Sequence, residues 1–301
     1  MRRVPPEKNY TKEQLIRRVR FFRPLANLGM AVFFWKKKAG KELYLETSAG
    51  RVRVLAYGLE RPEKLPLFVN MHGGGFVLGR AEMDDPHLMK VAIKANVKIL
   101  NVDYSLAPEA PFPKALEECY AVVKYAKEHA EELGIDPERI AVGGHSAGGN
   151  LSAAICLKDV ERKELGINCI ILDYPPLDLY TDPYLKPRPK GSYLHPRLCR
   201  IFDASYCIEK EERKNPLVSP IYAFLEQLKT FPPTLILTAS QDSLCQEAED
   251  FRDKLLQAGV DVTHKRFEDS RHGFTMTNKP DAVEGWQMII HHLKHHLHDA
   301  D

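Results

Sequence analysis

One stretch of the sequence decides its fold: Gly143-Gly144-His145-Ser146-Ala147-Gly148-Gly149. It follows a short apolar run at 139–142 that predicts a strand, and it precedes a segment at 147–158 that predicts a helix. Gly-x-Ser-x-Gly between a strand and a helix is typical of a nucleophile elbow, a sharp turn that lifts a serine hydroxyl clear of a sheet. Small residues are required because a Cβ would clash with the neighbouring chain. Ser146 is therefore the predicted nucleophile, and the alternative is a glycine-rich turn that only connects strand to helix.

A second glycine-rich loop, His72-Gly73-Gly74-Gly75, directly follows the apolar run at 67–71. Glycines let backbone N–H groups approach a ligand closely, and two or three such donors can stabilise the oxyanion of a tetrahedral intermediate. We expect this oxyanion hole to consist of the N–H groups of Gly73, Gly74 and Ala147. No Lys-Ser/Thr pair follows the glycines and no dinucleotide fingerprint is present, so phosphate binding is not predicted.

A serine hydroxyl needs a general base to become a good nucleophile. Among the twelve histidines, His272 stands in a loop after the last expected strand. Asp242 closely follows the apolar run at 234–238, at the carboxyl end of an expected parallel strand, where such sites assemble. We therefore predict His272 as the base and Asp242 as the acid that orients it. Asp261, Glu268 and Asp269 are weaker candidates for the acid.

Short apolar segments alternate with amphipathic ones along most of the chain, which indicates a mostly parallel sheet covered by helices on both faces. The expected strands are residues 43–46, 52–55, 67–71, 97–102, 139–142, 169–172, 234–238 and 260–267. The expected helices include residues 86–95, 114–132, 147–158 and 245–258. With no linker or repeat in view, residues 1–301 are interpreted as a single domain.

Two segments fall outside this alternation. Residues 176–230 are rich in proline and tyrosine, and a long insertion of this kind is usually a lid or a binding element. Within residues 1–40, a capping box at 11–14 predicts the start of a helix. Pro24 separates this helix from a second apolar stretch, which is too short to span a bilayer. We expect both segments to form a helical cap over the site. The candidate pocket residues are Phe33, Phe34, Trp35, Phe76, His145 and Tyr184.

Charge and cysteine content suggest a cytoplasmic enzyme without a metal or another cofactor. Residues 1–41 contain twelve Lys or Arg against two Glu, which we interpret as a solvated helix rather than a nucleic-acid arm. Weak peripheral contact with a membrane remains an alternative. The six cysteines form no C-x-x-C pair and are predicted to be buried free thiols, which suits a reducing compartment. The histidines of 291–298 are expected to form a surface face on a packed helix.

The motifs together resemble the hormone-sensitive-lipase-like branch of the α/β-hydrolases, the bacterial esterase/lipase group, over about residues 65–274. The resemblance is carried by 72–76, 103–109, 112–113, 136–149, 215–216, 219–220, Asp242 and 272–274, and by the chain order serine, aspartate, histidine. It implies an eight-stranded sheet with a cap, and hydrolysis of short-chain acyl or aryl esters through an acyl-enzyme. Two positions depart from the family: Ser105 replaces a common Arg, and His145 replaces a common acidic residue.

Other functions use the same fold. A noncatalytic receptor for a small ligand would typically have lost a member of the triad, and this sequence keeps all three. An amidase or an acyltransferase would use the same triad, so the sequence leaves both open.

Overall fold

The computed structural model describes residues 4–34 and 39–298 and contains an eight-stranded sheet of order β1-β2-β4-β3-β5-β6-β7-β8. β1 and β2 form an antiparallel hairpin, β2 pairs antiparallel with β4, and all further neighbours are parallel. The strands are β1 (Lys41–Thr47), β2 (Gly50–Tyr57), β3 (Leu65–Met71), β4 (Lys98–Val102), β5 (Ile135–His145), β6 (Ile167–Asp173), β7 (Thr234–Ala239) and β8 (Val262–Phe267). The predicted α/β-hydrolase fold with a mostly parallel sheet is confirmed.

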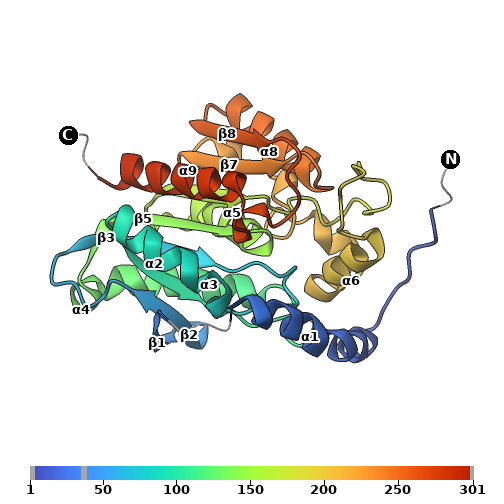
Figure 1. The fold of residues 1–301 in the computed structure, drawn as a ribbon, viewed down its shortest axis with the longest axis horizontal. Helices are drawn as coiled ribbons and strands as arrows, with labels where there is room; N and C mark the ends of the chain where they lie inside the picture. Colours follow the sequence, from blue (N-terminus) through green and yellow to red (C-terminus); the bar gives the residue numbers. More distant parts are fainter. Residues whose placement is uncertain (1–3, 35–38, 299–301) are drawn as a thin grey trace.

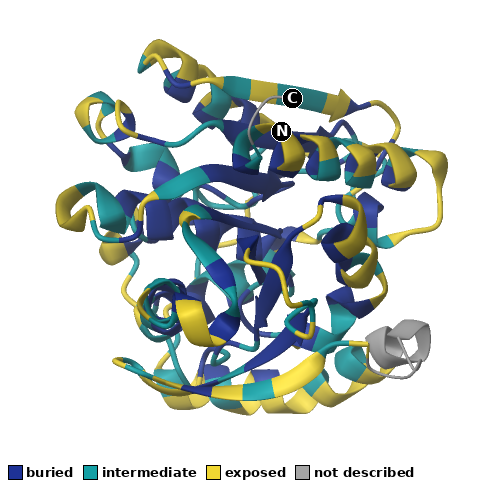
Figure 2. Cartoon of the chain, turned by 90° about the vertical axis from the view of Figure 1, so that its left-hand side faces the viewer, coloured by how far each residue is buried: buried dark blue, intermediate teal, exposed yellow. Residues whose placement is uncertain are grey.

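Helices cover both faces of the sheet (Figure 1). One face packs against α2 (Asp85–Lys94) and α9 (Pro280–Leu297), and the other packs against α3 (Lys114–Glu128), α5 (Ala147–Arg162) and α8 (Cys245–Gln257). β3, β4 and β7 are buried along their whole length for this reason, and Figure 2 shows exposed residues mainly on the outer surfaces. Each fully buried aliphatic side chain contributes about 1.5–3 kcal/mol, so these strands form the core of the molecule.

Shorter elements complete the chain. They are α4 (Ala130–Leu133), α6 (Pro196–Tyr206), α7 (Leu225–Leu228), and the 3₁₀ segments η1 (Ala81–Asp84), η2 (Glu211–Lys214), η3 (Pro220–Tyr222) and η4 (Phe274–Met276). The helix predicted over 114–132 is thus two helices, because the backbone at His129 leaves the helical conformation. Gly134 ends the second helix in the left-handed conformation, as is usual for a glycine at this position.

The first helix, α1 (Lys12–Phe34), begins with the predicted capping box: Thr11 and Gln14 each accept a hydrogen bond from the other's backbone N–H. The helix continues through Pro24, where the sequence suggested a separation, although proline removes one internal hydrogen bond. Tertiary contacts hold it there, since the Arg23 guanidinium donates to the carbonyl of Ala107 at 2.6 Å and to Glu109. Val19 packs in a small core with Ile201 of α6, and both helices lie at the same end of the molecule (Figure 1).

None of the helices in the described part of the chain combines the length and the apolar character needed to cross a membrane.

Candidate active site

Ser146 occupies the sharp turn between β5 and α5. Its backbone has φ 54° and ψ −122°, a conformation that costs a non-glycine residue about 1–3 kcal/mol. The turn is held by a hydrogen bond from the Ser146 N–H to the carbonyl of Asp173 at 2.8 Å. The strand, strained serine and helix match the elbow predicted from the sequence, and Ser146 lines a pocket.

Two glycines of the elbow are required by the close approach of β3. A Cβ on Gly144 would lie 2.3 Å from the carbonyl oxygen of Met71, and a Cβ on Gly148 would lie 1.9 Å from the same atom. Both distances are far inside van der Waals contact, and the obstacle is backbone in the middle of the sheet. A side chain at Gly144 would require β3 to move away from β5, and a side chain at Gly148 would require β3 to move away from α5.

We therefore expect Gly148→Ala to reduce the free energy of unfolding by about 3 kcal/mol or more, because overpacking against backbone cannot be relieved by a rotamer change. Urea denaturation measures this loss. Gly259→Ala is the matched control, because Gly259 has φ +85° but a Cβ added there would meet nothing within 4 Å. That control isolates backbone strain and should cost about 1 kcal/mol. Equal stability of the two variants would contradict the steric argument.

The structure brings the three predicted catalytic side chains into one hydrogen-bonded chain. His272 Nε2 lies 2.9 Å from Ser146 Oγ, and His272 Nδ1 lies 2.7 Å from Asp242 Oδ2. Asp242 follows β7 and is 2% exposed, and its other oxygen accepts the backbone N–H of Leu244. The carboxylate thus fixes the proton on Nδ1 and leaves Nε2 free to accept the proton of the serine hydroxyl.

Two tyrosines that the sequence analysis did not single out hold His272 in place. The ring of Tyr174 meets the imidazole edge-on at 4.9 Å, and its hydroxyl donates to Thr275 Oγ1 at 2.8 Å, which in turn donates to Asp173. The hydroxyl of Tyr193 donates to the backbone carbonyl of His272. Tyr174 directly follows β6, a position that could have marked it, whereas no local pattern marks Tyr193 within the proline-rich insertion.

In the glycine loop after β3, one of the three predicted oxyanion donors already has an acceptor within the protein. The N–H of Gly73 donates to His145 Nε2 at 3.1 Å. Within residues 4–34 and 39–298, the N–H groups of Gly74, Gly75 and Ala147 have no protein acceptor. Gly74 and Gly75 have φ values of +124° and +60°, which turn the loop around the pocket.

His145, which replaces the acidic residue common in the family, is buried beside the pocket. Burial, and to a smaller extent the neighbouring His272, lower its pKa to about 3. A neutral imidazole can accept the Gly73 N–H through Nε2, as the 3.1 Å contact requires. Asp84 Oδ1 lies 3.6 Å from the same nitrogen, and burial raises the pKa of Asp84 to about 7.

We expect activity to fall at acidic pH, because a protonated His272 cannot accept the serine proton, and we expect His145→Gln to keep this acidic limb of the pH profile. A histidine whose pKa is near 3 is neutral throughout the usual assay range, so it cannot produce that limb. The glutamine carbonyl can still accept the Gly73 N–H, and turnover should stay within about tenfold of wild type. The measurement is kcat/KM against pH, with His291→Gln on the exposed side of α9 as control. A variant with high turnover and no acidic limb would show that His145 sets the pH dependence.

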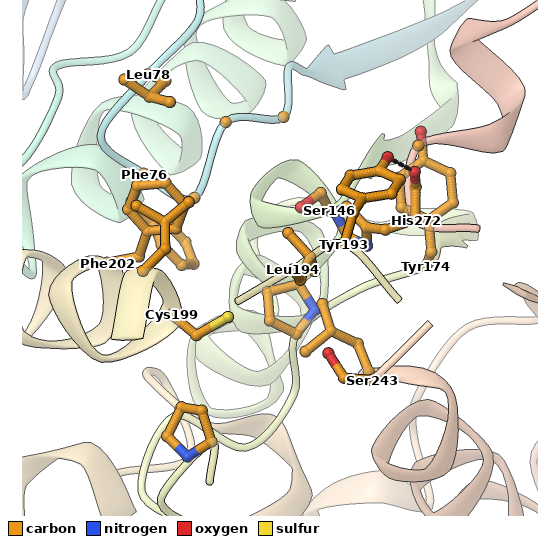
Figure 3. Close-up of a pocket in the computed structure, with 18 of the residues that line it drawn as sticks. Phe76, Leu78, Ser146, Tyr174, Tyr193, Leu194, Cys199, Phe202, Ser243 and His272 are labelled. Carbon is orange, nitrogen blue, oxygen red and sulfur yellow. Dashed lines mark hydrogen bonds between the residues drawn. The ribbon is translucent and has the colours of Figure 1, made fainter. Parts of the chain in front are cut away.

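The catalytic pocket has a volume of about 360 Å³, within the range of small-molecule sites. Figure 3 shows Ser146 and His272 on one side and Phe76, Phe202 and Cys199 across from them. Most of the lining is apolar: Phe76, Leu78, Tyr174, Tyr193, Leu194 and Phe202 contribute large side chains. Three charged residues, Lys186, Arg188 and Asp203, also line it.

The predicted pocket residues divide into three groups. Phe76 and His145 line the catalytic pocket. Tyr184 does not: it faces a separate hollow, where the Arg200 guanidinium lies 4.4 Å from its ring centre and is anchored by Asp182. Trp35 and the side chains of Phe33 and Phe34 lie outside the described residues.

In the part of the chain that the structure describes, no group of three or more His, Cys, Asp or Glu side chains is arranged to hold a metal ion. The histidine run on α9 is not wholly a surface face, as the sequence suggested. His292 is 4% exposed, since it falls on the side of the helix that packs on the sheet.

Comparison with known proteins places this geometry in a family. Residues 68–276 match a family model described as alpha/beta hydrolase fold, and the chain belongs to that family. The carboxylic ester hydrolase LipN of Mycobacterium tuberculosis is 34% identical over 247 residues, which cover 77% of this chain and 63% of LipN. The chain thus spans less than two thirds of LipN's length.

Two further similarities support membership of the hormone-sensitive-lipase-like branch. Hormone-sensitive lipase of Mus musculus is 46% identical over 99 residues, 33% of this chain and 13% of that protein. A solved structure of a hyperthermophilic esterase from the archaeon Pyrobaculum calidifontis superposes with a TM-score of 0.83 at 28% identity, covering 97% of this chain and 99% of that one. The predicted resemblance to the hormone-sensitive-lipase-like group is confirmed.

Proposed function

We propose that this protein is a serine carboxylesterase that hydrolyses short-chain acyl or aryl esters through an acyl-enzyme on Ser146. The observation that carries the proposal is the continuous chain from Ser146 Oγ to His272 at 2.9 Å and on to Asp242 at 2.7 Å. The three hydrogen-bonded side chains face a largely apolar pocket beside a glycine loop with unused N–H donors. Proteins similar to this chain are named ester hydrolases and esterases, which supports the same reaction.

Each step of the reaction has a group to perform it. As Ser146 Oγ attacks the ester carbonyl, His272 Nε2 takes the hydroxyl proton, and Asp242 stabilises the imidazolium that forms. The N–H groups of Gly74, Gly75 and Ala147 stabilise the oxyanion, assisted by the N-terminus of α5. His272 then gives its proton to the leaving alcohol, and the acyl group stays on Ser146. A water molecule, deprotonated by His272, then attacks the acyl-enzyme, and His272 returns the proton to Ser146 Oγ as the acid is released.

We also propose that α1 and residues 176–230 form a cap over this site. The pocket-lining residues Tyr193, Leu194 and Phe202 all come from the second segment. The first segment packs on it, because Val19 of α1 shares a small core with Ile201 and with Val77 of the glycine loop. Six free cysteines, five of them buried, suit a reducing and therefore cytoplasmic location.

The aligned triad favours an enzyme over a noncatalytic receptor, because a binding protein has no use for a proton path from serine to histidine. An amidase or acyltransferase would share the triad, so the test must compare substrates. We expect rapid release of 4-nitrophenol from a panel of 4-nitrophenyl esters, with the highest kcat/KM for short acyl chains, which the pocket of about 360 Å³ can hold. Matched anilides should react far more slowly. Absence of ester turnover, or faster anilide cleavage, would contradict the proposal.

A further inference from the structure

Asp203 is a carboxylate in the catalytic pocket that the proposed mechanism does not use. It lies on α6, one residue after Phe202, and lines the same pocket as Ser146 and His272. Residues 199, 202 and 203 recur at helical spacing, so they share one face of α6. In the described ranges no side chain or backbone donor comes within hydrogen-bond or ion-pair distance of its carboxylate. Asp203 is half-buried at the wall of a largely apolar pocket, where a carboxylate is normally paired, so an unpaired one points to a ligand.

The cations near Asp203 already have other partners. The Lys186 ammonium lies 2.6 Å from Glu247 Oε2 and also donates to the carbonyl of Asp178. The Arg213 guanidinium donates to the carbonyl of Cys207 at 2.9 Å and lies 3.5 Å from a Glu7 oxygen. Both cations act on Asp203 electrostatically, but neither lies within ion-pair distance of it, so within the described residues its carboxylate forms no ion pair.

The surrounding charges set the pH range in which Asp203 ionises. Burial raises its pKa to about 7; Lys186 and Arg213 oppose this rise, while Glu247 and Asp178 add to it. Arg188, an exposed residue that also lines the pocket, is the remaining cation to consider. Near neutral pH, Asp203 is therefore converted from a neutral acid to a carboxylate in a largely apolar pocket.

We propose that Asp203 forms a subsite that binds the ammonium group of an ester substrate, so that this esterase prefers esters bearing an amine beyond an apolar spacer. The inference rests on the proposed esterase function. An ammonium supplies both the charge and the hydrogen-bond donors that the carboxylate lacks. Phe202 and Cys199, on the same face of α6, offer apolar surface to the spacer.

The test uses substrates that differ only in ammonium against methyl. One pair is 4-nitrophenyl 6-aminohexanoate and 4-nitrophenyl heptanoate, and the other is 6-aminohexyl acetate and heptyl acetate, which places the amine on the alcohol side. At about pH 8 the ammonium ester of one pair should have a kcat/KM about tenfold or more above its partner. Asp203→Asn should bring that ratio to about one. Glu209→Gln, an exposed carboxylate beyond α6, is the control.

Wild-type protein alone provides a second measurement. Because the pKa of Asp203 is raised to about 7, the carboxyl is neutral below that pH and charged above it, so the ratio within a pair should rise with pH through that value. The ratio cancels the titration of the triad, which both esters share. A ratio near one at every pH in both pairs would overturn the subsite. The subsite would also be overturned if the ammonium ester were preferred by Arg188→Gln but not by wild type. Arg188 would then be the internal partner of Asp203.

A binding measurement separates this inference from the proposed function. Hexylammonium should raise the melting temperature of wild type and of Ser146→Ala, but not that of Asp203→Asn. If the alkyl esters are hydrolysed and neither ammonium preference nor hexylammonium binding is found, the Asp203 subsite is wrong and the esterase stands. If hexylammonium binds and no ester is hydrolysed, the esterase is wrong and the ammonium site stands.

Discussion

Ser146→Ala is expected to lower kcat for ester hydrolysis by about 10⁶-fold while the protein stays folded, because members of a triad act as one unit. The hydroxyl that the variant removes lies 2.9 Å from His272 Nε2 and is the only group in the proposed mechanism that forms a bond to the substrate. The strained turn is retained, since alanine tolerates φ 54° no worse than serine does. Steady-state kinetics with 4-nitrophenyl acetate, and the loss of the acyl-enzyme burst, measure the effect.

Ser152→Ala is the matched control for this experiment. Ser152 is a buried serine of α5, and its hydroxyl donates to the carbonyl of Gly148 at 2.8 Å, one turn earlier in the helix. Its loss removes a local hydrogen bond without touching His272, so turnover should remain near the wild-type rate. Near-wild-type turnover by Ser146→Ala would instead remove the basis of the proposed function.

Asp242→Asn should lower kcat by about 10⁴-fold, the size of the effect of the equivalent change in a serine protease. Asparagine keeps the shape of the side chain but has no negative charge. Its amide can also present a donor NH₂ group where the Asp242 carboxylate always presents an acceptor, 2.7 Å from His272 Nδ1. The imidazole then loses the tautomer in which Nε2 accepts the serine proton. Melting temperature checks the fold, and kcat is measured at the pH of maximal wild-type activity.

Asp250→Asn, at an exposed position of α8, controls for a general change of charge. If Asp242→Asn kept full activity, the acid would have to be sought among the weaker candidates of the same region. The structure disfavours them: Glu268 pairs with Arg266 at 3.4 Å, and within the described residues Asp242 is the carboxylate bonded to His272.

His145 explains how the chain tolerates its departure from the acidic residue common in the family. A carboxylate next to the nucleophile would accept a hydrogen bond from the glycine loop, and a neutral imidazole does the same for the Gly73 N–H. With Gly73 held in this way, the loop presents Gly74 and Gly75 to the pocket. In the proposed mechanism, His145 therefore positions the glycine loop and takes no part in proton transfer.

Local sequence patterns were sufficient for much of this protein. The eight strands were predicted because strand periodicity and apolar runs reflect burial within a few residues. The elbow was recognised because its sharp turn admits only small residues at Gly144 and Gly148, a requirement visible in the sequence as Gly-x-Ser-x-Gly. His272 and Asp242 were located because the ends of parallel strands meet at one edge of a sheet, so their positions after two strands brought them to Ser146.

Only the tertiary structure decided which groups are free to act. The N–H of Gly73 is engaged by the ring of His145 in β5, 72 residues further along the chain. Tyr193 and Phe202 line the pocket, whereas Tyr184 packs against Arg200. The orientation of these side chains is set by tertiary ion pairs and aromatic contacts, which no local pattern in the insertion predicts. The unpaired carboxylate of Asp203 likewise depends on Lys186 and Arg213 being matched elsewhere. Such contacts join residues far apart in sequence and leave no periodic trace in it, whereas the elements themselves are set by short-range sterics and burial.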